Sequence, residues 1–144
     1  MIRPPKICNA RSRRLKHHEL SAILKVINNP EVQALIQLAI ETAMRRGELM
    51  RIEAQDIDYD RRTLKIDETK TNVPRTIPLT KKAVSILSYQ TAGDSTGKLF
   101  SIKADSLTQA FSRACAKAGI QNLRFHDLRH EATSRFFETG LSLM

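Results

Sequence analysis

The spacing of apolar residues changes from a helical period to a strand period and back again along this chain. Up to residue 52 the apolar residues recur every three or four positions, as on the buried face of a helix. Between residues 63 and 79 they alternate, which is the period of a half-buried strand. The helical period returns after residue 80. The sequence therefore predicts an α+β fold that is mostly helical, with helices packed around a small antiparallel hairpin or sheet.

Start and stop signals divide the helical parts into separate helices. The first predicted helix, over residues 20–27, stops at an Asn-Asn-Pro sequence. In this sequence Asn29 is a suitable N-cap and Pro30 a suitable first residue for the second helix. Further helices are expected from Thr80, from Asp105 or Ser106 to Gly119, and from Phe125 to Gly140.

Charged residues arrive abruptly at the end of the second predicted helix, in the sequence TAMRRGEL at residues 42–49. The glycine is unfavourable inside a plain helix. We therefore expect a bend, with Thr42 capping a short new helix that reaches Ile52. Arg45 would then lie in a first turn, where free backbone amides and the helix dipole favour an anion.

The chain is strongly basic, with 24 Lys and Arg against 15 Asp and Glu and a formal net charge of +9. Such a charge favours a polyanionic partner, and double-stranded DNA is the simplest choice. Residues 1–16 contain six basic residues and no acidic one. We expect residues 1–16 to be a basic arm or interdomain linker and residues 17–144 to be the folded domain. The expected DNA contacts in the arm are Arg11, Arg13, Arg14 and Lys16.

Other classes of protein are disfavoured. The chain has no apolar run of the length that a bilayer needs and none typical of a signal peptide, so we expect a soluble, cytoplasmic protein. Cys8 and Cys115 are too few for a disulfide framework, so free thiols are expected. His126 and His130 stand one helical turn apart and could ligate a metal, but no third ligand is evident. No metal and no cofactor are therefore expected.

Three short motifs carry candidate chemistry: T-x-x-R-x-x-E-L at residues 42–49, T-K-T at residues 69–71 in the loop of the hairpin, and H-x-L-R-H at residues 126–130. An arginine fork fits two oxygens of a phosphate, and a histidine nearby can add a hydrogen bond or move a proton. Each motif alone is weak, because short motifs match by chance. Together, in this order and on these elements, they resemble the catalytic domain of the tyrosine recombinases, the phage integrase family.

The resemblance implies an activity. Members of this family attack a DNA phosphodiester with a tyrosine, hold the strand as a 3′-phosphotyrosine and pass it to a new 5′-hydroxyl. By motif position, Arg45 and Arg129 would bind the nonbridging phosphate oxygens. Lys70 would protonate the leaving 5′-oxygen, and His126 would donate a hydrogen bond or act as a base. The resemblance further implies a protein of a bacterium, phage or plasmid that assembles as a tetramer on DNA.

Two more residues, Glu48 and His130, match supporting positions of the family. The nucleophilic tyrosine of the family lies downstream of H-x-x-R, however, and neither Tyr59 nor Tyr89 has its context. The resemblance therefore implies an integrase-like catalytic core that is truncated before the nucleophile. Such a fragment would bind DNA without cleaving it.

Other functions remain as hypotheses. In a non-catalytic basic DNA-binding module, the positive charges would only neutralise backbone phosphates. Such a module does not require the four candidate catalytic residues to converge, whereas an enzyme does. A type IB topoisomerase would share the chemistry, but the compact forms of the first and third motifs favour an integrase. Scattered side chains would instead indicate a structural or partner-binding fragment.

Overall fold

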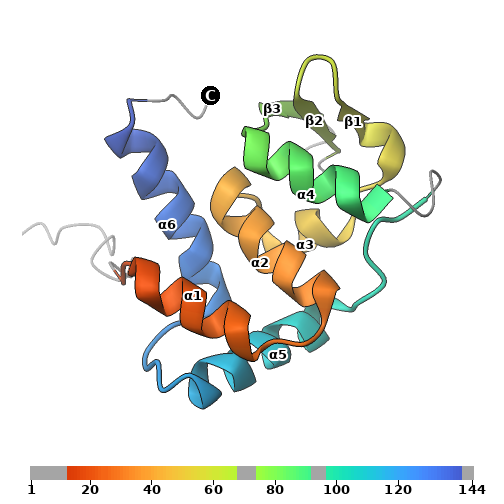
Figure 1. The fold of residues 1–144 in the computed structure, drawn as a ribbon. Helices are drawn as coiled ribbons and strands as arrows, with labels where there is room; N and C mark the ends of the chain where they lie inside the picture. Colours follow the sequence, from red (N-terminus) through yellow and green to blue (C-terminus); the bar gives the residue numbers. More distant parts are fainter. Residues whose placement is uncertain (1–12, 68–73, 92–96, 141–144) are drawn as a thin grey trace, which may run out of the picture.

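The structure is a computed structural model that describes residues 13–67, 74–91 and 97–140. It is mostly helical with one small antiparallel sheet, which confirms the predicted fold class (Figure 1). In the described residues no helix has the length and apolar character to cross a membrane. The helices are α1 (His17–Val26), α2 (Pro30–Thr42), α3 (Arg46–Met50), α4 (Lys81–Thr91), α5 (Ala104–Lys117) and α6 (Phe125–Glu138). The strands are β1 (Ile57–Asp58), β2 (Thr63–Ile66) and β3 (Arg75–Pro78), and a short 3-10 helix, η2 (Ala54–Asp56), precedes β1.

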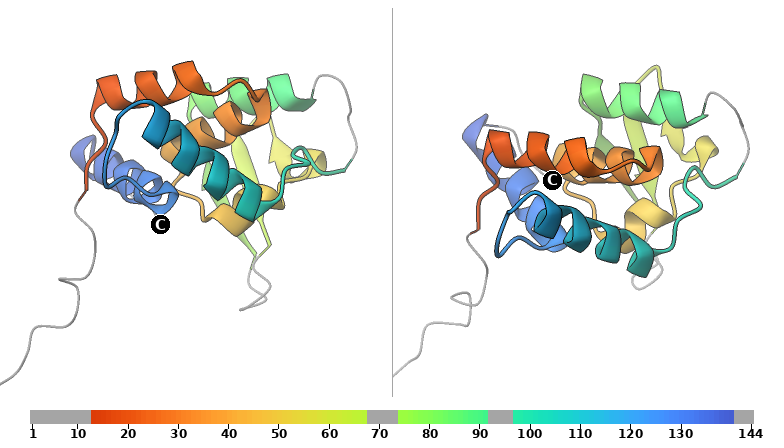
Figure 2. Two further views of the ribbon diagram at one scale, coloured as in Figure 1. Left: turned by 90° about the horizontal axis from the view of Figure 1, so that it is seen from below. Right: turned by 60° about the horizontal axis from the view of Figure 1, so that its bottom comes forward.

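Helix α2 forms the centre of the fold. It packs between α6 and α4, as Figure 1 shows. Its apolar side chains are buried on nearly all sides, and Leu35, Ile36 and Leu38 have no exposed surface. Figure 2 shows α1 and α5 lying side by side, and the two helices contact each other. The core therefore surrounds α2, and the neighbouring helices and the sheet are placed by contacts with it.

Local signals explain where the helices begin and end. The Asn29 side chain accepts a hydrogen bond from the Glu31 backbone N–H at 2.9 Å, with Pro30 as the first helical residue of α2. The Thr80 hydroxyl accepts the Ala83 N–H at 3.1 Å before α4. After α5, Gly119 adopts φ 72°, a left-handed conformation that suits glycine. These predicted boundaries are confirmed to within one residue or so.

The sheet has the strand order β1-β2-β3, and all pairs are antiparallel. Leu64 of β2 pairs with Ile77 of β3 in the predicted hairpin. Pro78 lies on the edge strand β3, as expected for a residue that cannot donate a ladder hydrogen bond. Strand β1 was not predicted, because two residues are too short to display an alternating period.

The predicted N-cap of the short helix was wrong. Thr42 is the last residue of α2, and its hydroxyl donates to the Leu38 carbonyl at 2.6 Å. Threonine favours this bond to the preceding turn when it lies inside a helix. Ala43 follows in the left-handed region at φ 59°, and α3 begins after Arg45, which is its N-cap residue. The bend was predicted correctly, but it lies between α2 and Arg45.

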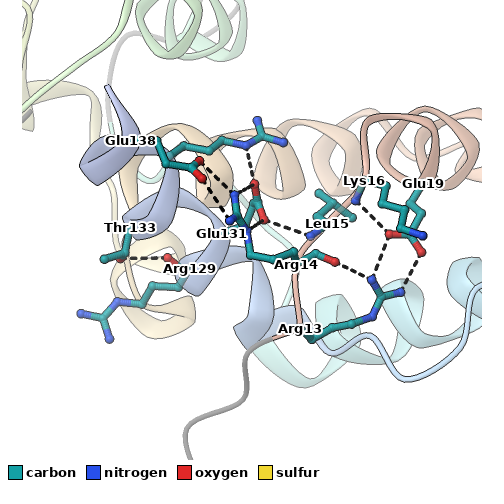
Figure 3. A network of polar contacts seen from close by, with 10 residues as sticks. Arg13, Arg14, Leu15, Lys16, Glu19, Arg129, Glu131, Thr133 and Glu138 are labelled. Carbon is teal, nitrogen blue, oxygen red and sulfur yellow. Dashed lines mark hydrogen bonds and ion pairs between the residues drawn. The ribbon is translucent and has the colours of Figure 1, made fainter. Parts of the chain in front are cut away.

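Part of the predicted basic arm packs against the body of the protein (Figure 3). Arg13 forms two hydrogen bonds with the Glu19 carboxylate, at 3.0 and 2.7 Å. Arg14 pairs with the buried Glu131 of α6 at 2.9 Å, and also with the exposed Glu138 at 3.0 Å. The Leu15 backbone N–H donates to Glu131 at 2.9 Å. Residues 13–16 are therefore attached to α1 and α6, while residues 1–12, with Arg11, lie outside the described residues.

The pKa of the Glu131 carboxylate reflects this attachment. Burial raises its pKa, but the hydrogen bonds from Arg14, from the Leu15 N–H and from Arg135 outweigh burial and lower the pKa from 4.5 to about 2. The ionised form is thus stabilised in the folded state. Its contribution to stability is present above pH 4.5 and is lost as the pH falls toward 2.

We predict that Glu131→Gln lowers the free energy of unfolding at neutral pH by about 3 kcal/mol, since it leaves Arg14 and Arg135 without their shared carboxylate. The difference from the wild type should shrink at about pH 3, because the wild-type carboxylate is then partly protonated. Urea unfolding at both pH values measures this. Glu138→Gln is the control, because its carboxylate is 59% exposed and should contribute less than about 1 kcal/mol. Equal effects of the two substitutions would contradict the prediction.

Candidate active site

Helix α6 carries two different faces. Phe125 and Leu128 are buried in the core, and Leu128 has no exposed surface. His126, Arg129 and His130 occupy a neighbouring stripe at positions i, i+3 and i+4, and are exposed or half-buried. Because the core fixes the apolar face, it also fixes the direction in which these three polar side chains project.

Arg129 connects α6 to the bend between α2 and α3. Its Nε donates to the Ala43 carbonyl at 2.8 Å, and this residue lies two positions before Arg45. The Arg129 side chain therefore contacts the segment that begins the first motif. Figure 3 shows Arg129 pointing away from the ion pairs around Glu131, so the two sides of α6 have separate polar contacts.

Glu48 organises the beginning of α3. Its carboxylate is 4% exposed and accepts the Arg45 backbone N–H at 2.8 Å. It also accepts two hydrogen bonds from Arg75, at 2.7 and 3.0 Å, whereas the guanidinium of Arg45 approaches it only to 3.5 Å. The sequence motifs do not include Arg75, because an arginine at the start of a strand has no distinguishing spacing. Only the structure connects it with Glu48.

Positive charges accumulate around this carboxylate. Burial lowers the pKa of Arg129, and the positive charges of Arg45 and Arg75 lower it further, while Glu48 opposes them. Burial raises the pKa of Glu48, but hydrogen bonds from Arg75 and the Arg45 N–H outweigh it, and the net pKa is lowered. The guanidinium groups of Arg75 and Arg45 thus contact this carboxylate, and its charge also acts on Arg129.

His126 and His130 pack edge to face, with ring centroids 5.1 Å apart. Partial burial lowers the pKa of His126, and the charges of His130 and then of Arg129 lower it further. His126 is therefore mainly neutral at pH 7, so it can donate one hydrogen bond and accept another. A hollow of about 450 Å³ borders His126 and Arg129, and Arg46 and Thr108 lie along it.

Five of the six residues predicted to be catalytic or supporting lie in the described residues: Arg45, Glu48, His126, Arg129 and His130. The charges of Arg129 and Arg45 both lower the pKa of His126, although Arg45 comes from a distant part of the chain. Lys70 lies outside the described residues. Within residues 13–67, 74–91 and 97–140, no group of three or more His, Cys, Asp or Glu could hold a metal ion. Cys115 is a buried free thiol, as predicted.

The sequence model of the phage integrase family matches residues 13–144. The chain belongs to the phage integrase family. The match begins within the predicted arm, at the residue whose guanidinium pairs with Glu19.

Relatives in the family include recombinases of bacteria and archaea. The chain is 34% identical over 142 residues to the shufflon-specific DNA recombinase of Escherichia coli. The matched region covers 97% of this chain and 37% of that protein. It is 26% identical to the tyrosine recombinase XerA of Saccharolobus solfataricus, covering 99% of this chain and 50% of the relative. The chain thus spans half or less of the length of these two relatives.

Solved structures of integrases have the same fold. The integrase from mycobacterium phage Brujita superposes with a TM-score of 0.76 at 25% identity, covering 98% of this chain and 48% of the other. The lambda integrase catalytic core superposes with a TM-score of 0.73 at 20% identity, covering 88% of this chain and 84% of the other. The integrase catalytic-core fold is therefore shared.

We predict that the pKa of His126 lies below 6.5 and rises when Arg129 is replaced by Ala, because the substitution removes a positive charge and part of the burial. Titration of the imidazole signals by NMR measures this. Arg135→Ala serves as the control, since it removes a charge from the same helix but Arg135 is not among the groups that shift this pKa. An unchanged His126 pKa in Arg129→Ala would show that Arg129 is not close enough to act on the ring.

Proposed function

We propose that this chain is the catalytic core of a site-specific DNA recombinase, which breaks and rejoins DNA through a 3′-phosphotyrosine. The observation that supports the proposal is the hydrogen bond from Arg129 of α6 to the Ala43 carbonyl, two positions before Arg45, with His126 one turn before Arg129 on the same helix. A module that only neutralises a DNA backbone does not need this convergence. An enzyme that stabilises a pentavalent phosphate does.

Each proposed catalytic residue has a separate role in the cleavage of the phosphodiester. Arg45 and Arg129 bind the nonbridging oxygens of the scissile phosphate and stabilise the charge that builds up in the transition state. His126, neutral at pH 7, donates a hydrogen bond to the phosphate or accepts a proton from the attacking group. Lys70, from the T-K-T motif, protonates the departing 5′-oxygen. Because the broken bond is stored as a phosphotyrosine, the reaction needs no cofactor.

Double-stranded DNA is the proposed partner. The net charge of +9 supports this, and a lambda integrase of the same fold, with a TM-score of 0.73, has been solved bound to DNA. The relatives are longer than this chain, so we infer that the complete enzyme supplies the nucleophilic tyrosine from a segment after α6. We further infer that the complete enzyme acts as a tetramer in the cytoplasm. Glu48 and His130 hold the catalytic groups in place.

To test the proposal, this chain is joined to the downstream segment of the Escherichia coli relative. The formation of a covalent protein–DNA adduct is then measured on a nicked duplex. Arg129→Ala should reduce adduct formation by about 100-fold or more, because one transition-state donor pair is lost. Duplex binding should weaken by less than about tenfold, since other basic residues supply nonspecific attraction. Arg135→Ala is the control and should form the adduct normally. An Arg129→Ala protein that still forms the adduct at the normal rate would overturn the assignment.

The basic segment permits a separate prediction. Arg14 is paired with two carboxylates, whereas Arg3, Lys6 and Arg11 belong to residues 1–12. Deleting residues 1–12 should flatten the salt dependence of DNA binding by about one unit of slope for each lost phosphate contact. Arg14→Gln should change this slope less than the deletion. Fluorescence anisotropy with a short duplex at several salt concentrations measures both, and an unchanged slope after deletion would show that the segment does not bind DNA.

A further inference from the structure

Arg46, the first residue of α3, is attached to a different element from its neighbour in the sequence. Its Nη1 donates to the Thr108 hydroxyl of α5 at 2.7 Å and lies 3.7 Å from the Asp105 carboxylate. The backbone and side chain of Arg45 instead contact Glu48 within the same turn. Consecutive residues at a helix start do not face each other, so the two side chains point in different directions. Arg46 therefore extends toward α5.

The Thr108 hydroxyl has a fixed orientation. It donates to the Ala104 carbonyl one turn earlier, at 3.2 Å, so a lone pair of its oxygen accepts the Arg46 N–H. This contact uses one of the five N–H donors of the guanidinium, and the Arg46 side chain is 42% exposed. The Asp105 carboxylate is 90% exposed, and an ion pair with so exposed a partner contributes little. Thr108 therefore holds the guanidinium in place without neutralising its charge.

The hollow of about 450 Å³ is bordered by Arg46 and Thr108 as well as by His126 and Arg129 of α6. None of the described residues that line this hollow is acidic. Several of the others are apolar: Ala39, Met44, Phe111, Leu123 and Phe125. Two guanidinium groups, one bonded to the Ala43 carbonyl and one bonded to α5, thus border one partly apolar space from different elements.

A DNA strand carries a phosphate at every nucleotide step, with a deoxyribose between successive phosphates. If the scissile phosphate binds to Arg129 and His126, a neighbouring phosphate of the same strand would lie along the hollow, toward Arg46. The deoxyribose between the two phosphates is less polar and suits the apolar part of the lining. A guanidinium that is already oriented binds a phosphate with a smaller loss of conformational entropy than a mobile one.

We propose that Arg46 binds the phosphate next to the scissile phosphate in the same DNA strand, and that Thr108 is the positioning residue that orients it. The inference rests on the proposed function, because it takes the place of the scissile phosphate from Arg129 and His126. The site would then recognise two consecutive phosphates of one strand. Arg46 occupies an unspecified position of the first motif, and Thr108 lies in none of the three motifs.

The experiment compares two probes on this 144-residue chain: the thymidine dinucleotide TpT, with one phosphodiester, and the trinucleotide TpTpT, with two. Binding is measured by NMR from the imidazole signals of His126 and the side-chain Nε–H signals of Arg46 and Arg129. A salt concentration of about 0.15 M screens distant charges. The wild type should bind TpTpT about tenfold more tightly than TpT, because one charge-assisted contact is added.

Arg46→Ala should lower this preference to about twofold and leave the affinity for TpT nearly unchanged. Thr108→Val keeps the shape of the side chain but removes the acceptor, so the preference should fall to about fivefold. Thr108→Ser keeps the hydroxyl and should keep the preference of the wild type. Arg113→Ala is the matched control, because Arg113 is an exposed arginine of α5 that lines a different hollow. It should leave the preference unchanged.

An Arg46→Ala chain that keeps the wild-type preference for TpTpT would overturn the inference. Equal losses of affinity for TpT and TpTpT would also overturn it, because Arg46 would then act on the catalytic phosphate itself. Thermal unfolding shows whether each variant folds. If Arg46→Ala does not fold, Thr108→Val and Thr108→Ser decide, and the same preference in both would contradict the role of Thr108 in orienting Arg46.

The two proposals fail in different ways. If neither probe shifts the signals of His126 and Arg129 in the wild-type chain, the proposed function is wrong and this inference fails with it. If TpT shifts these signals but TpTpT binds no more tightly than TpT, only the role of Arg46 is wrong.

Discussion

Buried carboxylates that bind more than one positively charged group hold together the parts of this protein that are distant in sequence. Glu48 connects the start of α3 to β3 through Arg75. Glu131 connects α6 to the N-terminal segment through Arg14 and the Leu15 N–H. An isolated buried carboxylate would be strongly destabilising, and each is tolerated because several donors share it. The positions of α3, β3 and α6 around α2 are therefore linked through charge as well as apolar packing.

The ion pairs of Glu48 also offset part of the positive charge of the arginines at the site. Burial lowers the pKa of Arg129, and the positive charges of Arg45 and Arg75 lower it further. Glu48 offsets part of this repulsion from a buried position. The side chain of Arg45 is 54% exposed, and His126 lies on an exposed face of α6. In the proposed function, such a site would favour a phosphate more strongly than a single exposed arginine, because its charges are already in place.

The elements themselves could be predicted from the sequence, because their signals are local. Asn29, Pro30 and Gly119 mark helix ends through their own backbone preferences, and the alternation of Leu64 and Ile66 marks a strand. The motifs further placed Arg45, His126 and Arg129 in one site. The contact of Arg75 with Glu48 could not be found in this way, because it joins residues 27 positions apart. Thr42 was misassigned because its hydroxyl can bond either to the preceding turn or to the next helix, and the sequence is the same in both cases.

The guanidinium of Arg129 can make two kinds of contact through different nitrogen atoms, and one of them is with Ala43, which has a left-handed backbone conformation. An alanine at φ 59° is held in a conformation about 1 kcal/mol or more above its preferred one, and the carbonyl of this residue accepts the Nε–H of Arg129. The side nitrogen of the guanidinium thus restrains the backbone bend, which leaves the two terminal nitrogens for other contacts. A lysine at this position has a single side-chain nitrogen, so the same atom would have to contact both the Ala43 carbonyl and any other partner. Arginine is therefore suited here by the shape of its head group as much as by its charge.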